Sequence, residues 1–156
     1  MVESRAQSSG RRLRAAMVGG GQGAFIGAVH RLAQRLDGDI DLVAGAMHAD
    51  PEIAVASALE LGIAEDRAHR TWMDLLEDEN KRPEDERIDF VTIVTPNFLH
   101  APIALAFVQA GISVVCDKPL CLTEEEAAEL VAAREESGVV FAVTYNYTGY
   151  PMVREA

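Results

Sequence analysis

Short apolar runs alternate with segments of helical periodicity along the whole chain. Continuously apolar runs of four to eight residues are typical of strands buried on both faces of a sheet. The predicted strands are 13–18, 40–47, 67–70, 88–94, 112–116 and 139–144, of which 67–70 is short enough to be a minor one. Strands that alternate with helices require right-handed crossovers and a parallel sheet covered on both faces. The pattern therefore predicts a doubly wound α/β domain with strand order 3-2-1-4-5-6.

The predicted helices have recognisable beginnings and ends. Phe25, Val29, Leu32 and Leu36 recur at helical spacing after the first strand, and further helices are predicted over 52–61, from 72, from about 100 to 111, and from 124 to 137. Pro102 belongs in a first helical turn because it lacks an N–H. Thr123 with Glu126 forms a capping box for the last of these helices.

The segment between the first strand and the first helix is the most informative. Five of the nine residues 19–27 are glycines, which leave no Cβ between the loop and a ligand. The N–H groups at a helix start attract an anion, so the segment predicts a pyrophosphate-binding turn. The residues expected to face the cofactor there are Gly19, Gly21, Gln22, Gly23, Ala24, Phe25 and Ile26.

The spacing of these glycines leaves two interpretations of the fingerprint G-x-G-x-x-G/A. Gly19 and Gly21 occupy its first two positions, and Ala24 occupies the third. We favour a longer loop, in which 22–26 is an insertion over the phosphates and the helix begins at Gly27. A strand-to-helix turn that binds nothing is the alternative, although so many glycines carry a large entropic cost for a mere connection.

The tip of the second strand bears on the choice between NAD and NADP. An acidic residue about 20 positions after the glycines would accept from the ribose 2'-hydroxyl, but that place holds Met47 or His48. Either Asp50 reaches back to the ribose, or the site lacks the carboxylate that repels a 2'-phosphate and NADP is admissible. Asp50 followed by Pro51 is equally typical of a helix N-cap.

Polar residues follow the carboxyl ends of the other strands, where ligands of such sheets bind. This edge collects Thr95, Asn97, His100, Asp117, Lys118, Tyr145, Asn146 and Tyr147. Lys118 is the sharpest candidate because Pro119 fixes the chain behind it. Its ammonium could hold a substrate hydroxyl and stabilise an alkoxide while hydride leaves the same carbon. A solvated lysine, or a salt bridge to Asp117, is the alternative.

Composition and charge narrow the class of protein. The net charge of −11 argues against nucleic acid and anionic membranes as partners, since both require a basic face. No acidic residue occurs from Ser4 to Leu36, so a dianion at the glycine turn meets no local like charge. Residues 74–89, with eight acids and three bases, are predicted to be a solvated face and loop.

Two cysteines and the apolar content suggest the compartment. Cys116 and Cys121 imply neither a disulfide framework nor a metal site, so no metal is predicted. No apolar run approaches the ~18 residues that span a membrane. Residues 1–12 are predicted to be a disordered tail and not a signal peptide. We therefore expect a cytoplasmic protein.

Several motifs together resemble one family. Gly27-Ala28-Val29-His30, Thr95-Pro96-Asn97 with His100, and Asp117-Lys118-Pro119 resemble the Gfo/Idh/MocA oxidoreductases, the family of glucose-fructose oxidoreductase and inositol dehydrogenase. The resemblance runs from about Arg14 to the end. It implies an NAD(P)-binding Rossmann fold and hydride transfer at a hydroxyl of a sugar, cyclitol or related polyol, with Lys118 catalytic. It also implies that Thr95, Pro96 and Asn97 border the cofactor and that Lys118 lies near the nicotinamide. From their places at the sheet edge and the second strand's tip, cofactor contacts are also expected for His48, Asp50, His100, Asp117 and Asn146, although for His100 we favour a histidine packed against the sheet edge.

The length of the chain departs from that family. Its members continue into a second domain that supplies the substrate pocket, most subunit contacts and usually a catalytic histidine. We therefore interpret 13–149 as the cofactor domain and 150–156 as the start of a linker. The full-length form is expected to be a homo-oligomer, and the isolated domain to expose apolar surface and self-associate.

Two other functions remain open at this point. A non-catalytic dinucleotide-binding or sensor module would keep the glycine turn but would have no use for Lys118. An S-adenosylmethionine methyltransferase also opens with glycines after a first strand, but it gives no reason for Asp117-Lys118-Pro119 and would favour an acid at the second strand's tip.

Overall fold

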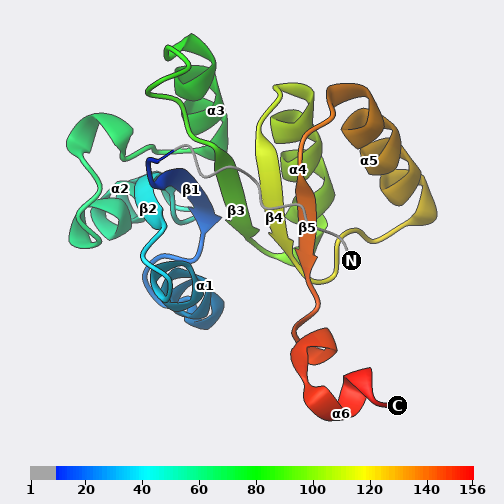
Figure 1. The fold of residues 1–156 in the computed structure, drawn as a ribbon. Coiled ribbons are helices and arrows are strands. Elements are labelled where there is room, and N and C mark those ends of the chain that lie inside the picture. Colours follow the sequence, from blue (N-terminus) through cyan, green and yellow to red (C-terminus); the bar gives the residue numbers. More distant parts are fainter. Residues whose placement is uncertain (1–9) are drawn as a thin grey trace.

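A single parallel sheet forms the centre of the molecule (Figure 1). The structure, a computed structural model, describes residues 10–156. The strands are β1 (Leu13–Gly19), β2 (Ile40–Ala46), β3 (Phe90–Val94), β4 (Ser113–Asp117) and β5 (Phe141–Thr144), and their order is β2-β1-β3-β4-β5. All four pairings are parallel, which confirms the predicted α/β parallel sheet.

The predicted third strand was wrong. Its segment forms one isolated parallel bridge, from Ala68 to Gly45 of β2, and the His69 N–H donates to the Gly45 carbonyl at 2.8 Å. Residues Glu65–Arg67 coil into a short 3₁₀ helix, which leaves too little extended chain for a ladder. The remaining order is the predicted one with its outermost strand reduced to that bridge.

Six α-helices complete the fold of the described residues. They are α1 (Phe25–Arg35), α2 (Pro51–Glu60), α3 (Trp72–Lys81), α4 (His100–Gln109), α5 (Glu124–Ser137) and α6 (Pro151–Arg154), with short 3₁₀ helices at Asn97–Leu99 and Asn146–Gly149. The predicted capping box of Thr123 and Glu126 is confirmed, and Gly138 ends α5 in a left-handed conformation. Thr71 and Asp74 form a second capping box, at the start of α3.

The first helix begins earlier than predicted. It starts at Phe25, with Ala24 as its N-cap, so the insertion over the phosphates does not extend to Ile26. Gly27 lies within the helix and is buried. The helix can begin there because its first turn needs no side-chain cap when a ligand or solvent can meet its N–H groups.

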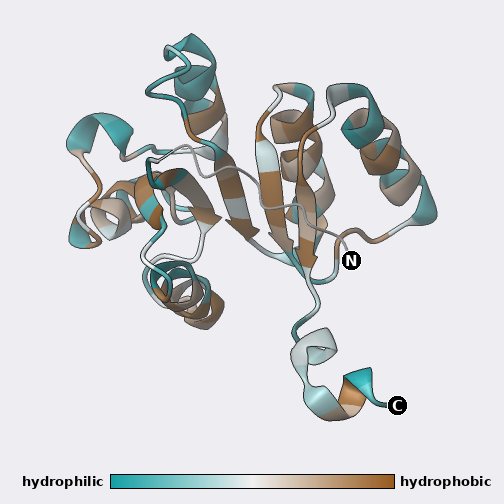
Figure 2. Ribbon diagram, in the orientation of Figure 1, coloured by the Kyte–Doolittle hydropathy of each residue, from teal (hydrophilic) through white to brown (hydrophobic). Residues whose placement is uncertain are grey.

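Alternate residues of β1 point to opposite faces of the sheet. Ala16 and Val18 belong to a core cluster that includes Leu75 of α3, Phe107 of α4 and Leu130 of α5. The intervening Met17 packs in a second cluster with Ala58 of α2, and Ile26 of α1 packs against that cluster. Figure 2 shows the strands as mostly hydrophobic. The sheet is therefore covered on both faces, with α1 and α2 on one side.

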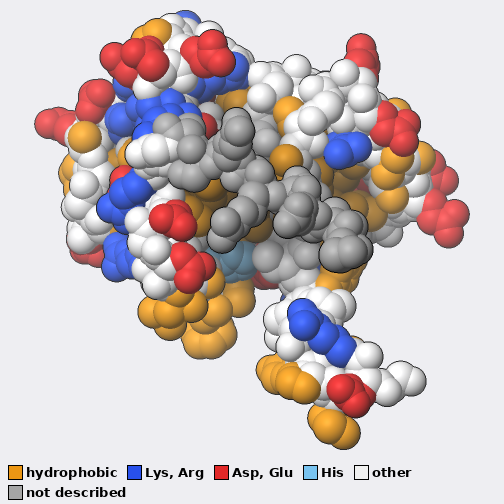
Figure 3. All heavy atoms as spheres, viewed as in Figure 1, with side chains coloured by type: hydrophobic (Ala, Val, Ile, Leu, Met, Phe, Trp, Pro, Cys, Tyr) orange, Lys and Arg blue, Asp and Glu red, His pale blue; other side chains and the backbone are white. Residues whose placement is uncertain are grey.

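The apolar stripe of α1 faces outward. Phe25, Val29, Leu32 and Leu36 are 82%, 44%, 65% and 75% exposed, and they gather on one surface of the molecule (Figure 3). The opposite side of the helix packs through Gly27. The spacing that predicted the helix therefore marks an exposed apolar surface; self-association through it stays a prediction.

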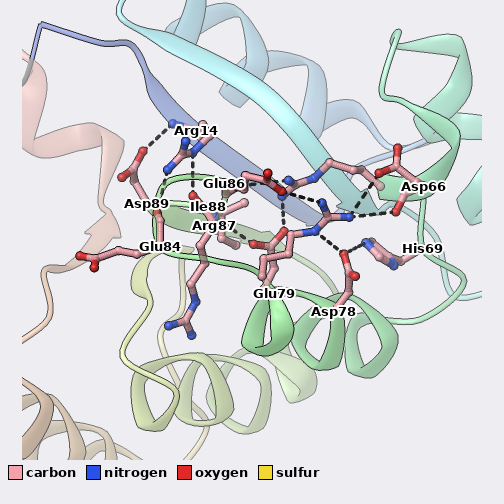
Figure 4. Close-up of polar contacts among 12 residues, drawn as sticks. Arg14, Asp66, His69, Asp78, Glu79, Glu84, Glu86, Arg87, Ile88 and Asp89 are labelled. Carbon is pink, nitrogen blue, oxygen red and sulfur yellow. Dashed lines mark hydrogen bonds and ion pairs between the residues drawn. The ribbon is translucent and has the colours of Figure 1, made fainter.

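The acidic run 74–89 is not uniformly solvated, contrary to prediction. Glu79 is completely buried, and one of its carboxylate oxygens pairs with Arg67 Nη2 while the other accepts from the Ile88 N–H at 2.9 Å (Figure 4). Three further arginines, Arg14, Arg82 and Arg87, make hydrogen bonds around it. Its partners come from other parts of the chain, which is why charge counting along the sequence could not find them.

The first described residues are held to the sheet by ion pairs. Residues 1–9 of the predicted tail lie outside the described residues, while Arg11 pairs with Asp89 at 2.6 Å and Arg12 pairs with Asp41 at 2.8 Å. The pairing with Arg11 lowers the pKa of Asp89. Within residues 10–156, no helix has the length and apolarity needed to cross a membrane.

Candidate functional site

The glycine turn is packed so closely that side chains cannot replace its hydrogens. A Cβ on Gly19 would lie 2.8 Å from the Val94 carbonyl oxygen, and one on Gly21 would lie 2.5 Å from the Met47 carbonyl oxygen. A Cβ on Gly27 would overlap the backbone of Gly20. Gly27 thus holds the close-packing position of the fingerprint, and the turn crosses β2 and β3 within van der Waals distance.

Hydrogen bonds fix this turn against β2 and α2. The Gly21 N–H donates to the Met47 carbonyl at 2.8 Å, and the Gln22 N–H donates to Ser57 Oγ at 3.1 Å. Ala24 provides no side-chain cap for α1, and the first turn of that helix contains no acidic residue. The first N–H groups of a helix have no partner within it, so this end of α1 is suited to an anion.

A cleft of about 410 Å³ lies beside the turn, where strand order reverses between β1 and β3. Ligands of open α/β sheets bind at such a switch point. The cleft is lined by Val18, Gly19, Gly20, Ala24, Ala46, Met47, His48, Ala49, Arg70, Thr71, Trp72, Met73, Val94, Thr95, Pro96, Leu99 and Ile103. Most of these side chains are apolar, which suits an aromatic base, and the glycines stand at one end.

One buried polar atom at the wall of the cleft has no partner. Within the described chain, Thr95 Oγ1 is buried and makes no hydrogen bond, although Thr95 lines the cavity. A buried hydroxyl without a partner costs roughly 1–3 kcal/mol. The hydroxyl lies beneath the wall of the cleft and not on its surface, so a ligand could reach it only if the Thr95 side chain rotated. The glycine cradle and the apolar lining of the cleft together fit a dinucleotide.

At the tip of β2, His48 lines the cleft, whereas Asp50 caps the N-terminus of α2. Asp50 Oδ1 accepts from the Glu52 N–H at 2.9 Å and the Ile53 N–H at 3.2 Å, so Asp50 is the N-cap of α2. It does not line the cavity, whereas His48 does. Contact between Asp50 and a ribose stays a prediction.

His100 connects two of the predicted segments. It is 1% exposed, with Nδ1 2.6 Å from the Pro119 carbonyl oxygen and Nε2 2.8 Å from the Thr95 carbonyl oxygen. Both ring nitrogens thereby face carbonyl oxygens of the protein, and a neutral ring donates to one of the two. His100 therefore fixes the segment after β3 against the segment after β4, and a direct cofactor contact stays a prediction. Pro96 and Asn97 between these points are exposed.

Asp117 and Lys118 follow β4 and differ in their surroundings. Asp117 Oδ1 accepts from Thr144 Oγ1 at 2.8 Å and lies 3.8 Å from His30 Nε2. Burial lowers the pKa of His30, and the neighbouring Asp117 carboxylate partly opposes that shift. Within residues 10–156 no hydrogen bond or ion pair holds the exposed Lys118. The alternative salt bridge from Lys118 to Asp117 is thus not formed there.

The remaining candidates lie outside the cleft. Asn146 is exposed in the 3₁₀ helix after β5, as are Tyr145 and Tyr147. Gln22 donates through Nε2 to Glu60 at 2.8 Å, and Gly23, Phe25 and Ile26 follow at the mouth of the turn. Both cysteines are free, and burial raises the pKa of Cys116 to about 12. No group of residues suited to a metal occurs in the described part of the chain.

Several residues of the site were missed from the sequence. Trp72 and Arg70 line the cleft from the segment that leads into α3, Ser57 supports the turn, and Thr144 holds Asp117. Thr144 ends a predicted strand at the same sheet edge as Asp117, and that placement was the signal available for it. Ser57 carried no signal, because a serine inside a helix is ordinary.

Known proteins resemble most of this chain. Residues 13–145 match the Gfo/Idh/MocA family, described as an oxidoreductase family with an NAD-binding Rossmann fold. An oxidoreductase from Sinorhizobium meliloti is 48% identical, with a TM-score of 0.83, over 93% of this chain and 40% of that one. An inositol dehydrogenase homolog from Azotobacter vinelandii, solved with NADH and myo-inositol, is 39% identical with a TM-score of 0.87, over 93% and 38%.

A curated relative agrees with these structures. The levoglucosan dehydrogenase of Pseudarthrobacter phenanthrenivorans is 32% identical over 148 residues, which are 90% of this chain and 35% of that protein. The chain thus spans between a third and two fifths of the length of these relatives. With its fold, glycine turn and cleft now described, the chain belongs to the Gfo/Idh/MocA oxidoreductase family and contains that family's NAD-binding Rossmann domain.

Proposed function

We propose that the chain is the nucleotide-binding part of an NAD(P)-dependent oxidoreductase that transfers hydride at a hydroxyl of a sugar, cyclitol or related polyol. The observation that carries the proposal is the apolar cleft beside the glycine turn. The names of the relatives, an inositol dehydrogenase homolog and a levoglucosan dehydrogenase, support the substrate class.

Different residues at the carboxyl edge bind different parts of the dinucleotide. The glycine turn and the start of α1 bind the pyrophosphate through backbone N–H groups. Trp72 and Leu99 are among the apolar residues that line the cleft and suit the adenine. When bound, the nicotinamide gives or accepts the hydride. Thr95 Oγ1 offers a hydrogen bond to the dinucleotide once its side chain rotates into the cleft.

Lys118 is the proposed catalytic residue. Thr144 holds the neighbouring Asp117 carboxylate, which leaves the Lys118 ammonium free to hydrogen-bond a substrate hydroxyl oxygen. At that oxygen it relays the proton or stabilises the developing alkoxide. An exposed lysine without a partner is also what the alternative, a solvated side chain, predicts, so the proposal rests on the position of Lys118 directly after β4 at the carboxyl edge.

Two measurements test the proposal. The only tryptophan, Trp72, lines the cleft, so its fluorescence should be quenched when NADH or NADPH binds the 156-residue chain, with calorimetry as a second readout. We expect binding but little turnover of polyols. Absence of binding by both nucleotides contradicts the proposed cofactor site.

The role of Lys118 needs a chain that can turn over substrate. In a version extended by the second domain of a relative, Lys118→Ala should lower kcat by roughly 10²- to 10⁴-fold while nucleotide affinity stays within twofold. An unchanged kcat would support the sensor module instead.

A further inference from the structure

The carboxylate nearest the β2 tip is already engaged. Asp50 Oδ1 accepts two backbone N–H groups of α2, from Glu52 and Ile53. A cofactor site that selects NAD places a carboxylate where it accepts from the ribose 2'-hydroxyl and repels a 2'-phosphate. The side chains that line this cavity include no aspartate or glutamate. The wall of the cleft itself therefore carries no carboxylate that would repel a phosphorylated ribose, although the Asp50 and Glu52 carboxylates adjoin His48 and Arg70.

His48 offers a donor at the same place. It lines the cavity, and its Nδ1 accepts from the Asp50 N–H at 2.9 Å. A neutral imidazole that accepts at Nδ1 carries its hydrogen on Nε2. The hydrogen bond to Asp50 thus fixes the ring as one that can donate to an oxygen in the cleft.

Arg70 brings a permanent positive charge to the cavity wall. It lies directly before Thr71, the N-cap of α3, and lines the cleft. Its Nη2 pairs with Glu52 Oε1, but the two side chains are 58% and 78% exposed. An exposed pair of this kind is weak, and the planar guanidinium keeps further donors for a phosphate, which it binds better than a single carboxylate.

We propose that this cleft binds NADP(H) in preference to NAD(H), with Arg70 and His48 binding the ribose 2'-phosphate. The inference rests on the proposed function, because it assigns part of the same cofactor site. Glu52 competes with the phosphate for Arg70, so binding exchanges one anionic partner of the guanidinium for another.

The test compares NADPH with NADH on the 156-residue chain at low ionic strength, with Trp72 fluorescence and calorimetry as readouts. The wild type should bind NADPH at least about tenfold more tightly, and Arg70→Ala should weaken NADPH roughly tenfold while NADH stays within twofold. Glu52→Gln removes the competitor and should strengthen NADPH binding. Arg12→Ala is the matched control, because Arg12 forms an exposed pair with Asp41 at 2.8 Å and does not line the cleft.

A variant designed to prefer NADH over NADPH gives a second test. His48→Asp places a carboxylate at the β2 tip, and it should reverse the preference so that NADH binds more tightly than NADPH. Far-ultraviolet circular dichroism establishes that each variant is folded. Equal affinity of the wild type for the two nucleotides, or a loss in Arg70→Ala that is the same for both, overturns this inference and leaves the proposed function standing. Binding of neither nucleotide overturns both.

Discussion

The two ends of the sheet bury polar groups in opposite ways. At the amino end, the buried Glu79 has a partner for each carboxylate oxygen, Arg67 on one and the Ile88 N–H on the other. At the carboxyl end, Thr95 Oγ1 is buried beside a cavity and has no partner in the described chain. The Glu79 carboxylate is satisfied by the chain and serves the fold, whereas the Thr95 hydroxyl is a group whose role must be tested by substitution.

Other buried side chains of the described chain also leave one polar atom without a hydrogen-bond partner. These atoms are Gln34 Oε1, Arg67 Nε, His69 Nε2 and Arg87 Nε. Arg67 and Arg87 donate through other nitrogens, to Glu79 and to the Ala110 carbonyl. Gln34 donates through Nε2 to Thr92, while His69 Nε2 lies 3.5 Å from Asp78. Thr95 has a single polar side-chain atom, so its hydroxyl has no second route to a partner. The following changes test each end of the sheet in turn.

Glu79→Ala should have the largest effect on stability. It removes the carboxylate from Arg67 Nη2 and from the Ile88 N–H, while Arg67 Nη1 keeps the Glu86 carbonyl, and breaking a buried pair costs roughly 3–5 kcal/mol. Urea unfolding followed by Trp72 fluorescence measures the loss. The control is Glu77→Ala, which removes a 68% exposed partner of Lys81 and should cost under about 0.5 kcal/mol. Similar losses in the two variants would show that Glu79 is not the centre of the network.

Gly27→Ala should destabilise the protein although it lies inside a helix. Alanine ordinarily stabilises a helix by roughly 0.5–1 kcal/mol relative to glycine, but here its Cβ would overlap the Gly20 backbone. We expect a net loss of roughly 1–3 kcal/mol and weaker NADH binding, because the glycine turn must shift. Ala28→Gly, at the neighbouring exposed position, should show only the helix-propensity cost. A gain in stability for Gly27→Ala would contradict the close packing.

Much of the carboxyl end could be predicted from the sequence, because its signals are local. Glycines at Gly19, Gly21 and Gly27 specify a close approach of the backbone by themselves. The start of α1 was misplaced because Phe25 and Ile26 are compatible with either loop or helix, and only the packing of Gly27 on Gly20 decides. The sequence also could not show that the apolar stripe of α1 faces outward, because only the packing of Gly27 on Gly20 sets the side of the helix that is buried.

The amino end could not be predicted, because its contacts are distant in sequence. Glu79 resembles its exposed neighbours in a run of acids, and Arg67 is 12 residues away. Arg14 and the Arg87 carbonyl to which it donates are 73 residues apart, and the pairing of β1 with β3 brings their segments together. Periodicity reports which face of an element is apolar, but it carries no information about which charge meets which.

Thr95→Val should separate binding from stability. Removing an unpaired hydroxyl should leave the free energy of unfolding unchanged or slightly higher, while NADH affinity falls roughly tenfold if the hydroxyl contacts the nucleotide. Thr92→Val is the matched control, since Thr92 Oγ1 accepts from Gln34 Nε2 at 2.7 Å and the residue is fully buried. It should cost about 1 kcal/mol of stability and leave NADH affinity intact. A loss of stability in Thr95→Val together with a loss of NADH affinity in Thr92→Val would contradict this prediction.

The smallest effect is expected from pH, and it involves two histidines, His30 beside Asp117 and His69 beside the Glu79 network. His30 lies 3.8 Å from Asp117, and His69 lies 3.5 Å from Asp78. Burial lowers the pKa of both rings below 6.5, and the neighbouring carboxylates only partly oppose the shift. The unfolded chain therefore binds protons first as pH falls through about 6.5, so stability is present above that pH and declines below it.

The stability of the wild type should accordingly decrease between about pH 7.5 and about pH 5.5. The lowered pKa of Asp89 contributes only near and below its ordinary value of 3.8, outside this range. In the double variant His30→Gln with His69→Gln, thermal unfolding midpoints at the two pH values should differ less than in the wild type. Single variants then divide the effect between the two histidines. An unchanged pH dependence in the double variant would mean that neither ring loses a proton on folding.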